Sequence, residues 1–145
     1  MKTILDFIFI PPILSYTDLV LLALRLVMGS IFLAHGIAKI KDLKGTQEWF
    51  GSIGFKPGVF WGTLVTFGEV IGGPLLMLGL ATTFWGLFFG IQMIVVTIWK
   101  ILKKQKLFGG FELDLLLVTC ALILLAVGAG NISLDKILLN WYFHI

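Results

Sequence analysis

The segment DLVLLALRLVMGSIFLAHGIA, residues 18–38, is typical of a membrane-spanning helix. It matches the length of about 20 mostly apolar residues that a helix needs to cross a bilayer. One arginine, Arg25, and one histidine, His35, interrupt it. Further apolar stretches of similar length lie at about 59–80, 82–102 and 111–130. The sequence therefore predicts an all-α integral membrane four-helix bundle, with residues 1–145 forming a single domain.

The composition agrees with a membrane protein. The 145 residues are 59% hydrophobic and 13% charged, with a mean hydropathy of +1.04. A soluble domain carries about 25% charged residues. The net charge of +3 comes from clustered lysines, which favours membrane topology over nucleic-acid binding, so no nucleic-acid partner is expected. The single cysteine, Cys120, excludes an internal disulfide.

The lysines predict the orientation of the bundle. Eight lie in or beside the loops between the first and second and between the third and fourth helices: Lys39, Lys41, Lys44, Lys56, Lys100, Lys103, Lys104 and Lys106. Only Lys2 and Lys136 lie on the other side. Loops 39–58 and 103–110 are therefore expected in the cytoplasm, with both termini outside a prokaryotic cell membrane. The aromatic segment TQEWFGSIGF, residues 46–55, is interpreted as a short interfacial segment, with a solvated loop as the alternative.

Two ionisable residues lie close to the middle of predicted helices. A charge at the bilayer centre costs roughly 2.5–3.5 kcal/mol on insertion scales, so such groups face the bundle interior and have partners. Arg25 and Glu69 are predicted at similar depths and are expected to form an ion pair, with Gln92 completing a polar layer. Whether this pair serves function or only fixes the register of the bundle is left open.

A second polar layer is predicted nearer the cytoplasm. His35 and Asp114 lie at matching distances from the centres of the first and fourth helices and are expected to meet. Lys39 and Glu112 are placed just beyond them, as a pair at the rim. The helical period puts five residues of the first helix on one face: Arg25, Gly29, Phe32, Gly36 and Lys39.

Three motifs resemble the DoxX family of four-helix membrane proteins. They are LALRLVMGSIFLAHGIAKI at 22–40, FGEVIGGPLLMLGLAT at 67–82 and GAGNISLDKIL at 128–138. The positions that match the family pattern are Arg25, His35, Gly36, Lys39, Glu69, Gly73, Gly79, Gly128, Gly130 and Asp135. The resemblance implies a link to quinone-dependent redox or thiol-stress functions. Because the chain lacks a cysteine pair and ends soon after the fourth helix, a complete thiosulfate:quinone enzyme is not expected.

The residues present exclude several redox cofactors. One cysteine cannot ligate an iron–sulfur cluster, and the two histidines are predicted on opposite sides of the membrane, which excludes a bis-histidine haem. Neither haem, iron–sulfur cluster nor other metal is expected, and the chain has no self-contained catalytic motif. What remains is a quinone or another small lipophilic ligand held in the bundle, with quinone as the expected cofactor. Its candidate pocket residues are Arg25, Gln92, Phe32 and Phe67, and the candidate catalytic residues are Arg25, Glu69 and His35.

The functional prediction is a quinone-linked redox component or accessory subunit of a membrane oxidoreductase complex. A soluble or membrane redox subunit is the expected partner besides the lipid bilayer, and a homo-oligomer is a further expectation. Two other interpretations stay open. One is a small proton-coupled transporter centred on Glu69, and the other is a non-catalytic membrane scaffold.

Overall fold

The computed structural model describes residues 16–143, and helices dominate this part of the chain. Their bounds are α2 Thr17–Lys41, α3 Leu43–Ser52, α4 Gly58–Leu78, α5 Thr82–Leu102, the single turn η2 Leu107–Phe111, α6 Glu112–Val127 and α7 Leu134–Phe143. No strand occurs within the described range. Four spans are long and apolar enough to cross a membrane: α2, α4, α5 and η2 with α6. The prediction of an all-α membrane bundle is confirmed.

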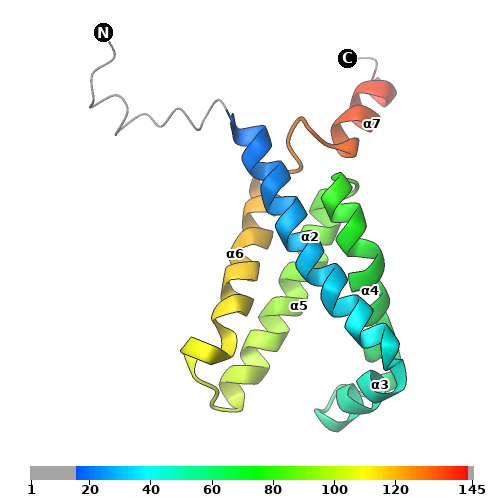
Figure 1. The fold of residues 1–145 in the computed structure, drawn as a ribbon, viewed down its shortest axis with the longest axis vertical. Coiled ribbons are helices and arrows are strands. Elements are labelled where there is room, and N and C mark those ends of the chain that lie inside the picture. Colours follow the sequence, from blue (N-terminus) through cyan, green and yellow to red (C-terminus); the bar gives the residue numbers. More distant parts are fainter. Residues whose placement is uncertain (1–15, 144–145) are drawn as a thin grey trace, which may run out of the picture.

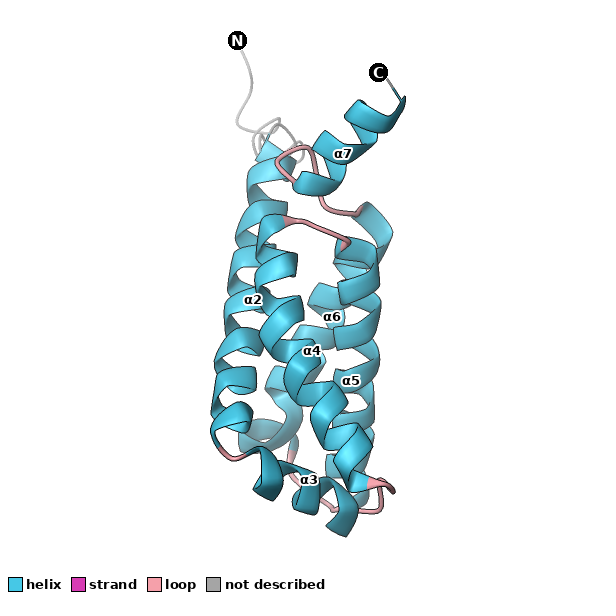
Figure 2. Cartoon of the chain, turned by 90° about the vertical axis from the view of Figure 1, so that its right-hand side faces the viewer, coloured by secondary structure: helices cyan, strands magenta, loops and turns pink. Residues whose placement is uncertain are grey.

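The ends of the bundle differ in what they carry. The start of α2 and the whole of α7 lie at one end, and α3 crosses the other (Figures 1 and 2). The turn between α5 and α6 also lies at the α3 end, so both lysine-bearing connections share that end (Figure 1). Lys2 lies outside the described residues. The side of the membrane that each end faces remains a prediction.

Helices α2 and α4 pack closely because glycines line their contact. A Cβ atom at Gly29 would lie 2.6 Å from the carbonyl oxygen of Gly73. A Cβ atom at Gly36 would lie 2.8 Å from the backbone nitrogen of Val70. Membrane helices without a hydrophobic driving force between them associate where small residues allow the backbones to approach. These glycines therefore fix α2 against α4.

Helices α5 and α6 form the second pair. A Cβ atom at Gly90 would lie 3.2 Å from the side chain of Ala121, so small residues again set the approach. The two pairs meet through stacked rings, since Phe32 and Phe89 lie 3.8 Å apart at an interplanar angle of 8°. From this region the α5–α6 pair diverges from the α2–α4 pair towards the α3 end (Figure 1).

Two short helices lie outside the main bundle. The predicted interfacial segment forms most of α3, which packs on the first half of α4 through Gln47 and Gly62. The amide of Gln47 donates to the Thr63 hydroxyl at 2.9 Å. Helix α7 was not predicted, because it has only ten residues and these are of mixed polarity. An element this short gives too few helical periods to be identified from its sequence.

Candidate functional site

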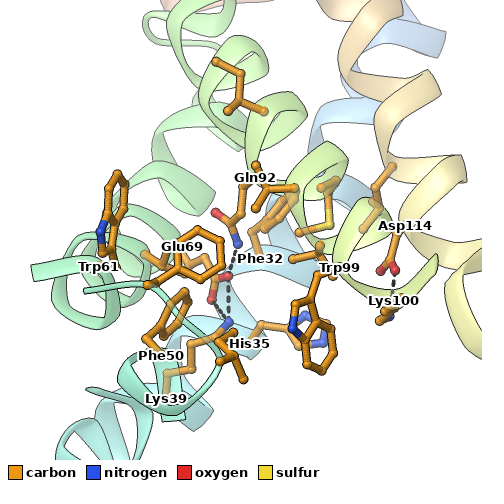
Figure 3. Close-up of a pocket in the computed structure, with 18 of the residues that line it drawn as sticks. Phe32, His35, Lys39, Phe50, Trp61, Glu69, Gln92, Trp99, Lys100 and Asp114 are labelled. Carbon is orange, nitrogen blue, oxygen red and sulfur yellow. Dashed lines mark hydrogen bonds and ion pairs between the residues drawn. The ribbon is translucent and has the colours of Figure 1, made fainter. Parts of the chain in front are cut away.

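A polar cluster lies in the middle of the bundle and is centred on Glu69 of α4, which is 1% exposed. The Lys39 ammonium of α2 lies 2.5 and 2.7 Å from the two carboxylate oxygens. The amide nitrogen of Gln92 on α5 donates to Oε1 of the same carboxylate. Three helices thus each contribute one polar side chain (Figure 3). The expected approach of Gln92 to Glu69 is confirmed.

The predicted ion pair between Arg25 and Glu69 is wrong. Arg25 is fully buried towards the α7 end, where it donates to the carbonyl oxygens of Met77, at 3.2 Å, and Ile132. The error has a geometric reason, because the prediction compared Cα depths only. Side chains on a helix lean towards its N-terminus. That lean carries Arg25 away from Glu69, and it carries the long side chain of Lys39 towards Glu69.

The predicted pair of His35 and Asp114 is also wrong. His35 is exposed, and its Nδ1 lies 2.8 Å from the carbonyl oxygen of Ile31, one turn back on its own helix. Asp114 pairs instead with Lys100 at 2.6 Å. Because α5 and α6 are the more closely packed neighbours, the nearest cation to Asp114 comes from α5 and not from α2.

The predicted pair of Lys39 and Glu112 is wrong as well. Lys39 pairs with Glu69 instead. The Glu112 carboxylate accepts from the backbone nitrogens of Gly109 and Gly110, at 2.8 and 2.9 Å. Glu112 therefore stabilises the turn that leads into α6. Phe67 also departs from its predicted place, since it is 41% exposed and does not line the cavity described below. It lies two residues from Glu69, about 200° around the helix.

A cavity of about 500 Å³ lies between the two helix pairs at the α3 end (Figure 3). Glu69, Lys39 and Gln92 line one part of it, and the Lys100–Asp114 pair lines another. Much of the remaining wall is apolar or aromatic. It includes Phe32, Trp49, Phe50, Ile53, Phe55, Trp61, Leu64, Val65, Phe88, Trp99 and Leu117.

The charges of the cavity cancel. Lys39 and Lys100 are each paired with a carboxylate, and their side chains are 27% and 24% exposed. A ligand that carried a net charge would have to break one of these pairs, which is costly away from water. The lining thus suits a neutral, largely apolar molecule with a few polar atoms.

The sequence contained signals for most of this site. Lys39 shares the predicted face of α2 with Phe32, and the aromatic segment that supplies Trp49 and Phe50 was recognised. The contribution of Lys100 was missed, because it was counted with the lysines that determine topology. His35 lines the cavity although it does not meet Asp114.

A different set of contacts closes the opposite end. The Asp135 carboxylate accepts from the backbone nitrogens of Ala81 and Thr82 at 2.7 and 2.9 Å, and its own nitrogen donates to the Gly79 carbonyl. Gly79 has φ +68°, and a Cβ atom there would lie 2.2 Å from the Arg25 guanidinium. Arg25 therefore links the segment before α7 to the end of α4, and Asp135 links the first turn of α7 to the α4–α5 turn, which are structural roles.

Comparison with known proteins agrees with the motifs. The DoxX family model matches residues 20–101, which include Lys39, Glu69 and Gln92. The chain belongs to the DoxX family. This DoxX protein is also 35% identical over 114 residues to a Bacillus subtilis (strain 168) protein described as "Putative oxidoreductase CatD". That alignment covers 79% of the chain and 83% of the relative. No solved structure matches this chain. The family and the four apolar spans make this chain an integral membrane protein.

Proposed function

We propose that this protein is a quinone-linked redox component of a membrane oxidoreductase complex. One observation carries the proposal: an ion-paired carboxylate, Glu69, lines an otherwise apolar and aromatic cavity between two helix pairs. The description of the Bacillus subtilis relative as an oxidoreductase supports the reaction class. The cancelled charges and the aromatic walls fit a neutral, ring-containing lipid such as a quinone.

The residues of the cavity have separate roles in this proposal. A quinone supplies two-electron redox chemistry when bound. Lys39 donates hydrogen bonds and stabilises negative charge that develops on a ligand oxygen. Glu69 exchanges the proton that accompanies the electrons. Phe32 and Phe88 form apolar walls around a ring. In this proposal a soluble or membrane redox partner subunit supplies the electrons.

The geometry argues against a proton-coupled transporter. In such a mechanism the central carboxylate exchanges its partners on different helices as the substrate moves. Glu69 instead has two close partners, Lys39 and Gln92, on two different helices. A non-catalytic scaffold would need no polar cluster inside a cavity, and the experiment below separates it from the redox proposal.

The test is to measure the quinone bound to the purified protein. The full chain is purified in mild detergent, and organic extracts are analysed by mass spectrometry for quinone per mole of protein. Wild type is expected to retain about one quinone, and Glu69→Gln is expected to lose most of it. Glu48→Gln is the matched control, because Glu48 lies on α3 with its side chain 70% exposed and does not line the cavity.

Two results would contradict the proposal. One is a folded wild-type protein that carries no quinone and binds none when a short-tailed quinone is added. The other is equal quinone content in wild type, Glu69→Gln and Glu48→Gln, which would place any quinone on the lipid-facing surface instead of in the cavity.

A further inference from the structure

The cavity has two sides that no close helix pair forms. Neighbouring helices surround it in the order α2, α4, α5 and α6, so α4 adjoins α5 on one side and α2 adjoins α6 on the other. The lining residues that are also exposed differ between these sides. On α4 and α5 they are all apolar or aromatic: Trp61, Leu64, Ile91 and Val95. On α2 and α6 they are His35 and Leu113. The α4–α5 side is therefore the more apolar of the two.

Helices α4 and α5 are in contact on the α7 side of the cavity. A Cβ atom at Gly72 would lie 2.3 Å from the ring of Trp85, and one at Gly68 would lie 2.5 Å from the ring of Phe88. Phe88 also lines the cavity, so the close contact ends where the cavity begins. Beyond it, towards the α3 end, the four exposed residues of α4 and α5 named above border what we call the α4–α5 opening.

Aromatic rings close the cavity towards the α3 end. Four edge-to-face contacts, with centroids 5.2–6.0 Å apart, run from α5 through α3 and its following loop to α4. In order, the rings are Trp99, Trp49, Phe50, Phe55 and Trp61. All five line the cavity, and edge-to-face packing is a favoured arrangement of aromatic pairs. These rings separate the cavity from the water at this end of the bundle.

The α4–α5 opening lies at the depth of the lipid tails. Glu69 lies next to the midpoint of α4. Leu64 lies five residues from Glu69, which is about 7.5 Å along α4, and Val95 lies three residues from Gln92, about 4.5 Å along α5. Half of the hydrocarbon core of a bilayer is about 15 Å thick. A molecule that passes this opening therefore comes from the bilayer and not from water.

We infer that the ligand carries a long apolar tail, and that this tail leaves the cavity through the α4–α5 opening into the leaflet on the α3 side. The inference rests on the proposed function and narrows its ligand to a membrane quinone, as opposed to a water-soluble one. The ring lies beside Glu69 and Lys39, and the tail runs over Leu64 and Ile91. On the α2–α6 side a tail would cover the imidazole of His35, and covering a polar group costs free energy unless it is hydrogen-bonded.

The test locates the tail by photolabelling. A benzoquinone with a decyl tail that carries a diazirine at its middle is bound to the full chain in lipid nanodiscs and illuminated. Labelled peptides are then mapped by mass spectrometry. We expect the label mainly on residues 59–65 of α4 and 91–98 of α5, and we expect excess decylubiquinone to remove it. The α3-side halves of α2 and α6 provide the internal comparison.

A second measurement tests the opening as the route of exchange. Leu64→Trp places a larger side chain in the opening, so the ligand has to wait for a conformational change. The time that excess decylubiquinone needs to prevent labelling is expected to lengthen about tenfold. Leu116→Trp is the matched control, because Leu116 is 59% exposed on α6 and does not line the cavity. Its exchange time is expected to equal that of wild type.

Label that decylubiquinone removes, but that lies on α2 and α6, would overturn the inference and leave the proposed function intact. Equal exchange times in wild type and a folded Leu64→Trp protein would also overturn it. Label that excess decylubiquinone does not reduce on any helix would instead refute the proposed function, and the inference with it. The labelling of wild type decides the question even if a variant does not fold.

Discussion

The ion pair between Lys39 and Glu69 predicts a strong energetic coupling between these two positions. In Lys39→Met the Glu69 carboxylate, whose side chain is 2% exposed, loses its cation and keeps only Gln92. Breaking a buried ion pair by removing one partner typically costs about 3–5 kcal/mol. We therefore expect Lys39→Met to lower the free energy of unfolding by about that amount.

The reverse substitution should cost less. In Glu69→Gln the Lys39 ammonium, which is 27% exposed, can turn towards the α3 end of the bundle. The loss then approaches that of hydrogen bonds to a charged group, about 1.5–3 kcal/mol. In the double variant no unpaired charge remains at Glu69, so Lys39→Met adds only about 1 kcal/mol, on the scale of one hydrogen bond. The coupling energy of the cycle is therefore about 2–4 kcal/mol.

The assay is unfolding of the full chain by titration with sodium dodecyl sulfate in mixed micelles, followed by circular dichroism. Arg25→Met supplies a second cycle with Glu69→Gln. Because Arg25 and Glu69 share no partner, their effects should add within about 0.5 kcal/mol. Strong coupling of Arg25 to Glu69, with none between Lys39 and Glu69, would refute the reasoning.

Three further predictions concern packing and topology. Arg25→Met leaves two backbone carbonyls unpaired and should cost about 2–4 kcal/mol in the same titration, while quinone content stays unchanged. Gly29→Leu forces α2 away from Gly73 and should cost about 1–3 kcal/mol, whereas an unshifted titration midpoint would contradict the close approach. A cysteine at Lys104, in a Cys120→Ser background, should resist impermeant maleimide added to intact cells, and efficient labelling would reverse the orientation.

The helices were predictable because their signals are local. Each spanning helix is a run of about 20 apolar residues, and the third predicted range, 82–102, coincides with α5. The buried face of α2 followed from the helical period, since Arg25, Gly29, Phe32 and Gly36 are all buried. These inferences need only the sequence of one helix and the thickness of the bilayer.

The ion pairs were not predictable in the same way, because they depend on how helices are rotated and which helices are neighbours. The prediction matched Arg25 with Glu69 because their Cα atoms lie at similar depths in the membrane. An arginine or lysine side chain reaches further than one helical turn, so Cα depth alone does not identify its partner. The correct partner of Glu69, Lys39, was assigned to the rim, because its Cα lies there. Helix α7 and the backbone carbonyl of Ile132, which accepts from Arg25, had no signal in the sequence.

The stacked rings of Phe32 and Phe89 explain why the two ends of the bundle differ. They join the helix pairs at one level, and Phe32 forms part of the cavity wall. On the α7 side of this stack, Arg25 donates to the backbone carbonyls of Met77 and Ile132. It thereby joins the end of α4 to the segment that follows α6. On the α3 side the pairs diverge, and the charged groups pair within each helix pair, as Lys39 with Glu69 and Lys100 with Asp114. Only the amide of Gln92 reaches across, from α5 to Glu69, among the hydrogen bonds described above. Among the described residues, no ion pair therefore joins α2 or α4 to α5 or α6. The space between the two helix pairs is left for a neutral ligand.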